Sequence, residues 1–445
     1  MESPSLLHAK AASIPSASPR IRHIQRTALT LLVIGGVVNY VDRATLAIAN
    51  PLIRADLGLS IADMGLLLSA FLWAYAFAQL PAGGMVDRLG PRKLLAGGMG
   101  FWSLAQVIAG LTTTFTQLFG ARVLLGLGEA PQFPTAARVV RDWFGGRDRG
   151  TATGVWNCSS TLGTAISAPV LTFLMLWFGW RWMFMIMGVL GVIVAAVWYF
   201  MYCDPHAAEM TDEENLYRTE GDVTGEGKPV TIDEWRRLFA CRTTWGMIMG
   251  FFGVIYLTWI YASWLPGYLE IQRHMSIRAS GLAMALPFVA GIFGSLFGGW
   301  LTDRLMLQYG VSPINSRKYP MAAALAGMAV FTLIAALVSS NILAIASISA
   351  AMFLGYVASA SAWAMASVAA PANCTASLGA MQNFGGYVGG ALAPMVTGFI
   401  VQATGSFVPA LLAGAGVGLV CALGYFLIIR RPIVEADVGL TTAGD

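Results

Sequence analysis

Four ionisable residues lie well inside long apolar stretches of this chain: Asp42, Arg43, Arg122 and Glu129. Placing one such charge at the centre of a bilayer costs at least about 2.5 kcal/mol on insertion scales. Four together therefore predict inward-facing side chains that pair with one another around a polar pathway. Arg122, Gly126 and Glu129 follow an i, i+4, i+7 spacing, so a helix presents all three on one face.

The depth of these residues along their helices predicts which charges meet. At 1.5 Å per residue, Asp42 lies roughly 10 Å and Arg122 roughly 8 Å below the outer ends of their helices. We therefore expect an ion pair between Asp42 and Arg122. This pairing leaves Glu129 and Arg43 nearer the middle of the pathway.

These residue types suit proton transfer and anion binding. Burial favours the neutral form of a carboxyl group and a nearby guanidinium favours the ionised form. Asp42 and Glu129 can therefore gain or lose a proton when a partner moves. Arg43 offers a planar fork that binds a carboxylate at two points. We expect Asp42 and Glu129 to carry protons and Arg43 to bind substrate; the alternative is a static network that joins two helices.

The rest of the chain is apolar enough to require a membrane. Of its 445 residues, 57% are hydrophobic and only 11% are charged. Soluble domains carry about 25% charged residues, so the composition excludes a soluble enzyme, a fibrous protein and a disordered protein. It predicts a polytopic α-helical membrane protein. The net charge of +4 is too small to indicate a nucleic-acid partner.

Cysteine and histidine patterns predict neither a metal site nor a disulfide framework. The five cysteines show no CxxC spacing, and the four histidines all fall outside the apolar stretches. The string closest to a phosphate-binding loop, Gly145-x4-Gly150-Thr151, lacks the lysine that an ATP-driven pump needs. We expect no enzyme activity and no cofactor, with the proton gradient as energy source. The first 20 residues lack the apolar core of a signal peptide.

Twelve apolar stretches are long enough to cross about 30 Å of hydrocarbon. They lie near residues 27–49, 61–84, 94–113, 117–140, 151–176, 181–203, 243–269, 279–302, 319–339, 342–369, 375–403 and 407–430. We predict an all-α integral membrane fold of two pseudo-symmetric six-helix bundles. The segments are a disordered N-terminus over 1–26, bundles over 27–203 and 243–430, a linker over 204–242 and a tail over 431–445.

The distribution of Lys and Arg predicts the orientation in the membrane. Of the 27 basic residues, 21 fall in the termini and in the loops on the same side, and only Arg54, Arg181, Arg273 and Arg278 fall on the other. Basic residues gather on the cytoplasmic side of membrane proteins. We therefore expect both termini and the linker to be cytoplasmic, with the chain in the inner (plasma) membrane.

The two halves of the chain also resemble each other. The second predicted helix ends in Gly83-x3-Asp87-Arg88, and the eighth ends in Gly299-x3-Asp303-Arg304. A repeat spaced by about half the chain indicates two similar bundles with a pathway between them.

Three motifs resemble a known family. Residues 83–93, GGMVDRLGPRK, look like the loop signature between helices 2 and 3 of the major facilitator superfamily. Residues 39–46, NYVDRATL, and 122–134, RVLLGLGEAPQFP, resemble its anion:cation symporter branch. Within that branch the chain resembles bacterial sugar-acid/proton symporters such as galactonate and glucarate carriers, and more distantly the vesicular glutamate and sialic acid transporters. The resemblance runs from about residue 27 to 430.

The resemblance also selects candidate substrate-binding residues. Besides Arg43, positions that line the site in the sugar-acid symporters match Tyr40, Tyr75, Trp363 and Asn383. Asn157, Ser160 and Trp259 complete the candidates because amides, hydroxyls and flat rings suit a polyhydroxylated acid. The chain departs from the pattern at Ser160, where those carriers commonly have a Gln, and at Ala362, where a hydroxyl residue is usual.

Charged residues at the helix ends predict a gate. Asp87, Arg88, Arg92 and Asp303 lie at the predicted cytoplasmic ends of their helices. A carboxylate near a helix N-terminus and a neighbouring Arg can hold the two halves together in one state. We expect these residues to gate transport without touching substrate.

The sequence thus predicts a secondary active transporter: proton-coupled symport, by alternating access, of an organic anion, most simply a sugar acid of hexonate, hexarate or hexuronate type. Two alternatives remain open. One is uptake of a less hydroxylated carboxylate, such as an aromatic or tartrate-like acid, and the other is proton-coupled export. The expected partners are the anion, protons and the lipid bilayer, with the chain as a monomer.

Overall fold

The computed structural model describes residues 17–145, 148–205, 208–218, 232–369, 371 and 374–438, apart from the side chains of Leu80, Asp87, Ile232 and Ala376. Over these ranges the chain forms helices and no strands. A membrane favours this outcome because each backbone N–H in hydrocarbon needs a partner within its own segment. The predicted segments 1–26, 204–242 and 431–445 fall partly outside the described residues.

Five helical elements form the N-terminal half: α2 (Pro19–Leu57), α3 (Ile61–Leu111), α4 (Phe115–Glu129), α5 (Gln132–Trp143) and α6 (Arg149–Met201). Two of them, α3 and α6, each contain two crossings joined at a sharp kink. The kinks fall at Gly90 (φ 77°) and Gly179 (φ 82°). Glycine adopts this left-handed backbone without steric penalty, so it allows the helix to turn back without a longer loop.

The first helix begins at Pro19, ahead of the predicted start near residue 27, so the end of the segment expected to be disordered is helical. Ser18 caps the helix by accepting a hydrogen bond from the Ile21 N–H at 3.2 Å, and Pro19 sits where its missing N–H is not needed. The Ser18 hydroxyl also donates to Glu214 at 2.6 Å, in the short helix α7 (Asp212–Arg218). This bond, more than the nearby Arg20 charge, holds the pKa of Glu214 below its usual value.

The C-terminal half contains α8 (Ile232–Ala240), α9 (Arg242–Gly267), its π-helical extension η2 (Tyr268–Gln272), α10 (Ile277–Leu307), α11 (Asn315–Leu337), α12 (Asn341–Ala369), α13 (Thr375–Thr404), α14 (Val408–Ile428) and α15 (Glu435–Val438). Side-chain caps and left-handed glycines mark several ends of the long helices in both halves. Ser276 caps α10 by accepting from the Ala279 N–H, and Gly405 ends α13 with a φ of 70°.

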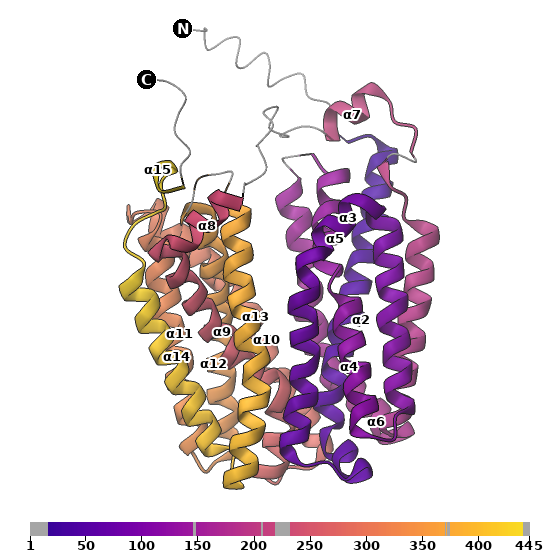
Figure 1. Ribbon diagram of the computed structural model, residues 1–445, viewed down its shortest axis with the longest axis vertical. Coiled ribbons are helices and arrows are strands. Elements are labelled where there is room, and N and C mark those ends of the chain that lie inside the picture. The colour runs from indigo at the N-terminus through magenta and orange to yellow at the C-terminus, as the bar shows by residue number, and fades with distance from the viewer. Residues whose placement is uncertain are drawn as a thin grey trace.

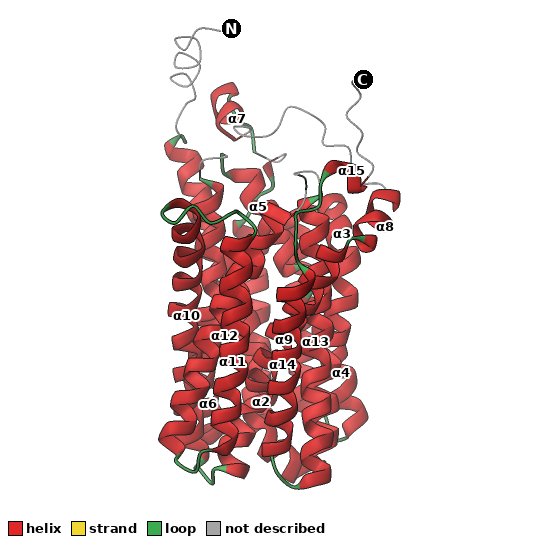
Figure 2. Ribbon diagram, turned by 90° about the vertical axis from the view of Figure 1, so that its left-hand side faces the viewer, coloured by secondary structure: helices red, strands yellow, loops and turns green. Residues whose placement is uncertain are grey.

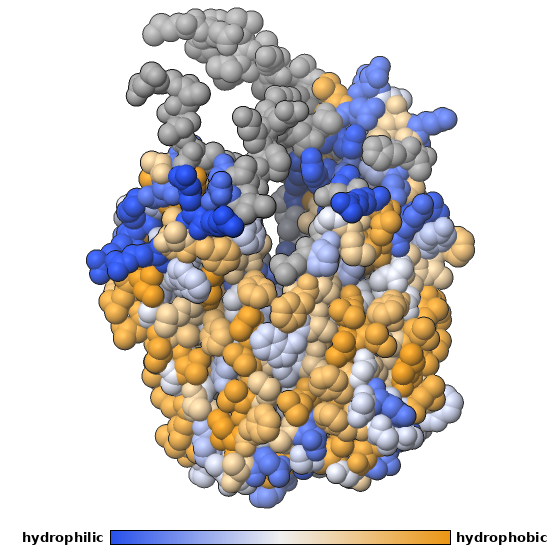
Figure 3. Space-filling view, viewed as in Figure 1, coloured by the Kyte–Doolittle hydropathy of each residue, from blue (hydrophilic) through white to orange (hydrophobic). Residues whose placement is uncertain are grey.

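The helices account for the predicted number of crossings. Within the described residues, ten helical segments are long and apolar enough to span a bilayer. One of the ten is α6, whose 53 residues turn at Gly179 and therefore cross twice. The remaining crossing is shared by α4 and α5, of 15 and 12 residues, which are separated by Ala130 and Pro131. On the face of the molecule shown in Figure 3, an apolar band lies between more hydrophilic ends.

The helices form two bundles that stand side by side (Figure 1). One bundle holds α2 to α6 and the other holds α9 to α14. The short helices α7, α8 and α15 lie at one end of the molecule, which is called the terminus-bearing end below (Figures 1 and 2). The hydrogen bond between Ser18 and Glu214 places the start of α2 at the same end.

The two bundles touch through small residues far from that end. On α3, a Cβ atom at Gly65 would lie 2.8 Å from the carbonyl oxygen of Pro394 on α13, and one at Gly398 would lie 3.0 Å from the Gly65 Cα. The Ser69 hydroxyl donates to the carbonyl of Ala391 across the same contact. Glycine is needed here because the two backbones approach directly.

The other helix pairs that join the bundles meet at the same end. Gly281, near the start of α10, packs against the Thr172 side chain of α6. Gly267, at the end of α9, faces the buried Asn50 of α2. All three contacts lie at the end of the molecule opposite the terminus-bearing end. At the terminus-bearing end, the ribbons of the two bundles stand apart in Figure 1.

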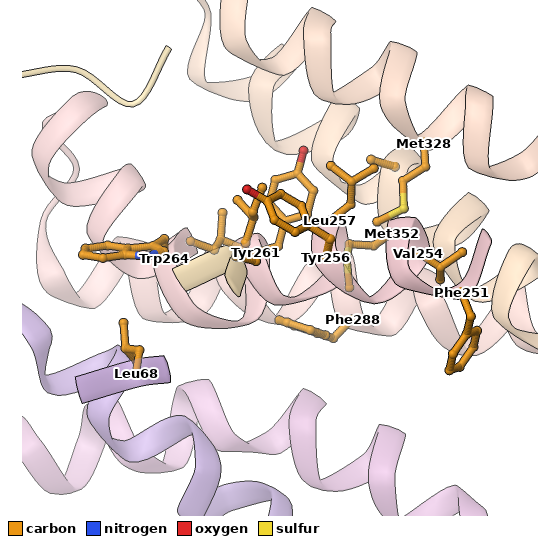
Figure 4. Packing of buried hydrophobic residues seen from close by; sticks show 14 of the residues in the cluster. Leu68, Phe251, Val254, Tyr256, Leu257, Tyr261, Trp264, Phe288, Met328 and Met352 are labelled. Carbon is orange, nitrogen blue, oxygen red and sulfur yellow. The ribbon is translucent and has the colours of Figure 1, made fainter. Parts of the chain in front are cut away.

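Figure 4 shows the packing of buried apolar side chains around α9. Tyr256 and Leu257 point toward Met328 and Met352 within the C-terminal bundle, whereas Leu68 of α3 approaches from the other bundle. One continuous cluster of buried apolar residues contains all of these side chains. Apolar side chains therefore form much of the packing in this region, beside the polar contacts made by Ser69, Thr172 and Asn50.

Candidate functional site

A break in one helix places Glu129 in the interior of the N-terminal bundle. α4 ends at Glu129 and α5 begins at Gln132, because Pro131 lacks the N–H that a continuous helix needs and its ring clashes with the preceding turn. Glu129 has no solvent-exposed surface. Its carboxylate accepts a hydrogen bond from the Nε atom of Arg43 on α2, at 2.7 Å.

Aromatic rings surround the Arg43 guanidinium. Its Cζ atom lies 4.8 Å from the ring centre of Tyr40, 5.2 Å from that of Phe71 and 4.7 Å from that of Tyr75. Rings at this distance attract a cation through their faces. Arg43 is thus held by one carboxylate and three rings, while no described residue forms a hydrogen bond with its Nη2 atom.

The other two intramembrane charges do not form the predicted pair. Asp42 and Arg122 are both buried, yet no ion pair within 4.0 Å joins them, and both Asp42 oxygens lack a hydrogen-bond partner among the described residues. The Arg122 guanidinium instead lies 5.2 Å from the centre of the Phe71 ring. The depth argument considered only the rise along each helix. Adjacent residues on a helix point about 100° apart, so the rotation of α2 that turns Arg43 toward Glu129 turns Asp42 in another direction.

Close packing of α4 on α3 positions these groups. A Cβ atom at Gly126 would lie 2.5 Å from the Phe71 carbonyl oxygen and 3.0 Å from the Tyr75 backbone nitrogen. Gly126 therefore lets α4 approach the turn of α3 that carries Phe71 and Tyr75. The single Phe71 ring then lies beside both guanidiniums, Arg43 and Arg122.

A cavity of about 270 Å³ opens beside Arg43, between the two bundles. Its size is near the lower end of the range for small-molecule sites. Seven of the eight residues predicted to bind substrate line it: Tyr40, Arg43, Asn157, Ser160, Trp259, Trp363 and Asn383. The eighth, Tyr75, is fully buried and reaches the site through its contact with Arg43.

The structure adds lining residues that the sequence analysis did not select. Tyr387 of α13 lines the cavity, and its ring centre lies 4.9 Å from that of Tyr75 across the bundle interface. Thr164, Thr258 and Tyr356 line the same space. Helical spacing carries part of this signal, since Tyr387 follows Asn383 by four residues and Thr164 follows Ser160 by four.

The predicted gating residues lie apart from the cavity. Arg92 is fixed within its own bundle: its Nε donates to the Tyr199 carbonyl at 2.7 Å and its Cζ lies 4.8 Å from the Tyr199 ring centre. Arg88 and Asp303 are exposed, and the side chain of Asp87 lies outside the described residues. The described part of the chain shows no ion pair between these positions, which accords with bundles that stand apart at this end.

Among the described residues, no group of three His, Cys, Asp or Glu side chains is placed to hold a metal ion. The site therefore consists of a buried Arg–Glu pair, an aromatic enclosure and a cavity with hydroxyl and amide groups.

Comparison with known proteins identifies a family and several related transporters. The family model described as Major Facilitator Superfamily matches residues 32–394. A probable L-galactonate transporter of Escherichia coli (strain K12) is 42% identical over 94% of this chain and 92% of its own length. A D-galactonate transporter of Escherichia coli O6:H1 is 31% identical (90% and 94% covered). A probable galactarate/D-glucarate transporter of Bacillus subtilis (strain 168) is 32% identical (88% and 89% covered).

A solved structure shares the fold. The crystal structure of a bacterial homologue of the human lysosomal transporter Spinster, in an inward-facing and occupied conformation, matches with a TM-score of 0.76 at 18% identity, covering 93% of this chain and 97% of that one. The family and its relatives are transporters, so the chain is a multi-pass membrane transporter and not an enzyme. The two-bundle helical fold, the family model and the relatives together show that the chain belongs to the Major Facilitator Superfamily.

Proposed function

We propose that the chain imports a sugar acid of hexonate, hexarate or hexuronate type together with protons, by alternating access. The observation that carries this proposal is the buried pair of Arg43 and Glu129 at the wall of the inter-bundle cavity. Relatives named as galactonate, galactarate/glucarate and hexuronate transporters support the substrate class.

The ion pair supplies a physical route to coupling. A substrate carboxylate and Glu129 compete for the same Arg43 guanidinium, because both are anions that bind its N–H groups. Protonation neutralises Glu129 and releases Arg43 for the substrate. Loss of that proton restores the pair and expels the anion. Binding of proton and substrate is therefore linked through Arg43.

Asp42 provides a second proton site in this proposal. Its carboxylate is buried, and among the described residues no hydrogen bond to it falls within 3.5 Å. Burying a carboxylate costs less when the group is neutral. Arg122 is the second buried cation of the same bundle. We assign Arg122 to balancing charge within the bundle and not to contacting substrate.

Alternating access follows from where the bundles touch. Contact at Gly65–Gly398 and Gly281–Thr172 closes the end opposite the termini. The excess of basic residues at the terminus-bearing end supports a cytoplasmic location for that end, in the inner membrane. The structure then represents a state open to the cytoplasm. Arg88, Arg92 and Asp303, with Asp87, would close that end in the opposite state.

A transport assay tests the proposal directly. The purified chain is reconstituted in liposomes, and uptake of labelled galactonate is followed with and without an imposed inward proton gradient. We expect accumulation with the gradient and simple equilibration without it. Accumulation driven by an outward gradient would identify an exporter. Parallel arms with tartrate, benzoate and sulfoacetate test less hydroxylated anions, and failure of galactonate alongside success of one of these would replace the substrate class.

A further inference from the structure

The cavity contains a single charge. Among its described lining residues, Arg43 alone is charged at neutral pH; the others are aromatic, aliphatic, hydroxyl or amide side chains. The remaining intramembrane charges, Asp42, Arg122 and Glu129, are buried inside the N-terminal bundle and do not line it. The site therefore offers one cation to a ligand, at one end of the cavity.

Three hydroxyl groups on the cavity wall have already used their donor hydrogens. The Ser160 hydroxyl donates to the Asn157 carbonyl at 2.7 Å, and the Thr164 hydroxyl donates to the Ser160 carbonyl at 2.7 Å, both within α6. On α9, the Thr258 hydroxyl donates to the Val254 carbonyl at 2.8 Å. A hydroxyl group has one donor hydrogen and two lone pairs, so these three groups present lone pairs to the cavity.

Such a wall matches hydroxyl groups of a ligand and opposes a second carboxylate. A ligand hydroxyl can donate to the lone pairs of Ser160, Thr164 or Thr258. A carboxylate is an acceptor only, so it finds repulsion there instead of a hydrogen bond. The neutral donors of the wall can hold oxygen atoms but leave a second negative charge without a cation. They are the side chains of Asn157, Trp259 and Asn383 and the hydroxyls of Tyr40, Tyr356, Ser359 and Tyr387.

We propose that the site selects sugar acids with one carboxylate, the aldonates and uronates, over those with two, the aldarates. This inference rests on the proposed function and names the substrate class within it. The carboxylate of the ligand binds Arg43, and its chain of hydroxyls extends along the wall formed by α6 and α9. The family contains relatives named for both classes, so membership alone does not decide between them.

Matched ligands make the test specific. Galactonate and galactarate share one carbon skeleton and differ only at the sixth carbon, which carries a hydroxyl in one and a carboxylate in the other. Gluconate and glucarate form a second such pair. Affinity of the purified full-length chain for each ligand is measured by thermal stabilisation at pH 7, where every carboxyl group of the four ligands is ionised. We expect the dicarboxylate of each pair to bind at least tenfold more weakly.

The outcomes separate the inference from the proposed function. Equal or tighter binding of galactarate and glucarate would overturn the inference and leave sugar-acid transport intact. Absence of binding by every aldonate, uronate and aldarate would instead remove the proposed function. A uronate that binds like the aldonates supports the inference, because it also carries one carboxylate.

A second cation in the cavity should weaken or remove the preference for one carboxylate. Thr258→Lys places an ammonium group on the acceptor wall, and we expect the ratio of galactarate to galactonate affinity to rise about tenfold or more. Thr258→Val is the matched control: it removes the lone pairs without adding charge, so it should weaken galactonate a few-fold and leave galactarate no better. An unchanged ratio in a folded Thr258→Lys protein would contradict the proposal. Thr164→Lys, on the opposite helix, provides the same test if Thr258→Lys does not fold.

Discussion

The two bundles contribute opposite kinds of chemistry to one cavity. The N-terminal bundle carries all four charges in the middle of the membrane, at residues 42, 43, 122 and 129. The middle of α9 to α14 carries no charge, and that bundle supplies rings, hydroxyls and an amide, including Thr258, Trp259, Trp363, Asn383 and Tyr387. The difference suggests a division of labour: one bundle carries charge and protons, and the other shapes the space that selects the ligand.

The largest effect is expected from removing the single cation of the cavity. Arg43→Gln should weaken galactonate binding by about 100-fold, because truncating one partner of a buried, hydrogen-bonded charge pair costs about 2–5 kcal/mol. Calorimetric titration measures the change. Arg43→Lys keeps the charge without the fork and should recover part of the loss. Near-normal galactonate affinity in Arg43→Gln would show that the charge contributed by the N-terminal bundle does not bind the substrate.

Replacing Glu129, the ion-pair partner of Arg43, should abolish proton coupling while substrate binding is retained. Glu129→Gln mimics the protonated residue, so Arg43 stays available and substrate exchange between the two sides should continue. Accumulation driven by a proton gradient should fall at least tenfold. Exchange and gradient-driven uptake are compared in the same liposomes. If the variant accumulates substrate normally, the coupling residue lies elsewhere.

The contact between the bundles can be tested with matched glycine substitutions on one helix. Gly65→Val adds side-chain atoms where even a Cβ atom would lie 2.8 Å from a backbone oxygen. A Cβ atom added at Gly84, on the same α3, would meet nothing within 4 Å. Such overpacking costs about 1–3 kcal/mol. We expect transport by Gly65→Val to fall about tenfold because the end opposite the termini no longer closes. Gly84→Val should transport normally. Equal transport rates in the two variants would show that the contact at Gly65 has no role in transport.

The smallest effect is expected in the uncharged bundle. Asn383→Ala removes an amide from the cavity wall and should raise KM for galactonate about five- to tenfold, equivalent to roughly one neutral hydrogen bond. The number of protons moved per substrate should not change. A changed proton stoichiometry in Asn383→Ala would show that coupling is shared by both bundles, against the division described above.

Much of this arrangement could be predicted from the chain itself. Apolar length gave the crossings, and the scarcity of charge in those stretches drew attention to Arg43 and Glu129. The resemblance to sugar-acid carriers supplied Tyr40, Trp363 and Asn383, which line the cavity. These features are local: each depends on residue type and position along one helix.

What could not be predicted depends on rotation and contact between helices. Whether Asp42 meets Arg122 and whether Arg43 meets Glu129 depend on the directions in which these side chains point, which a depth estimate does not contain. Tyr387 reaches the site because Gly65 and Gly398 bring α3 and α13 together, and Tyr75 meets it there. The helical start at Pro19 depends in part on Glu214, which lies far away in sequence.

The interruption of the fourth crossing also bears on how the chain enters the membrane. α4, with 15 residues, and α5, with 12, share one crossing that is interrupted at Ala130 and Pro131. α4 also carries Arg122 and Glu129, each of which opposes insertion. This crossing therefore depends on helices already in the bilayer, through Gly126 packed on α3 and Glu129 paired with α2. The buried Arg43–Glu129 pair that carries the proposed coupling thus also makes membrane insertion of the N-terminal bundle a cooperative event.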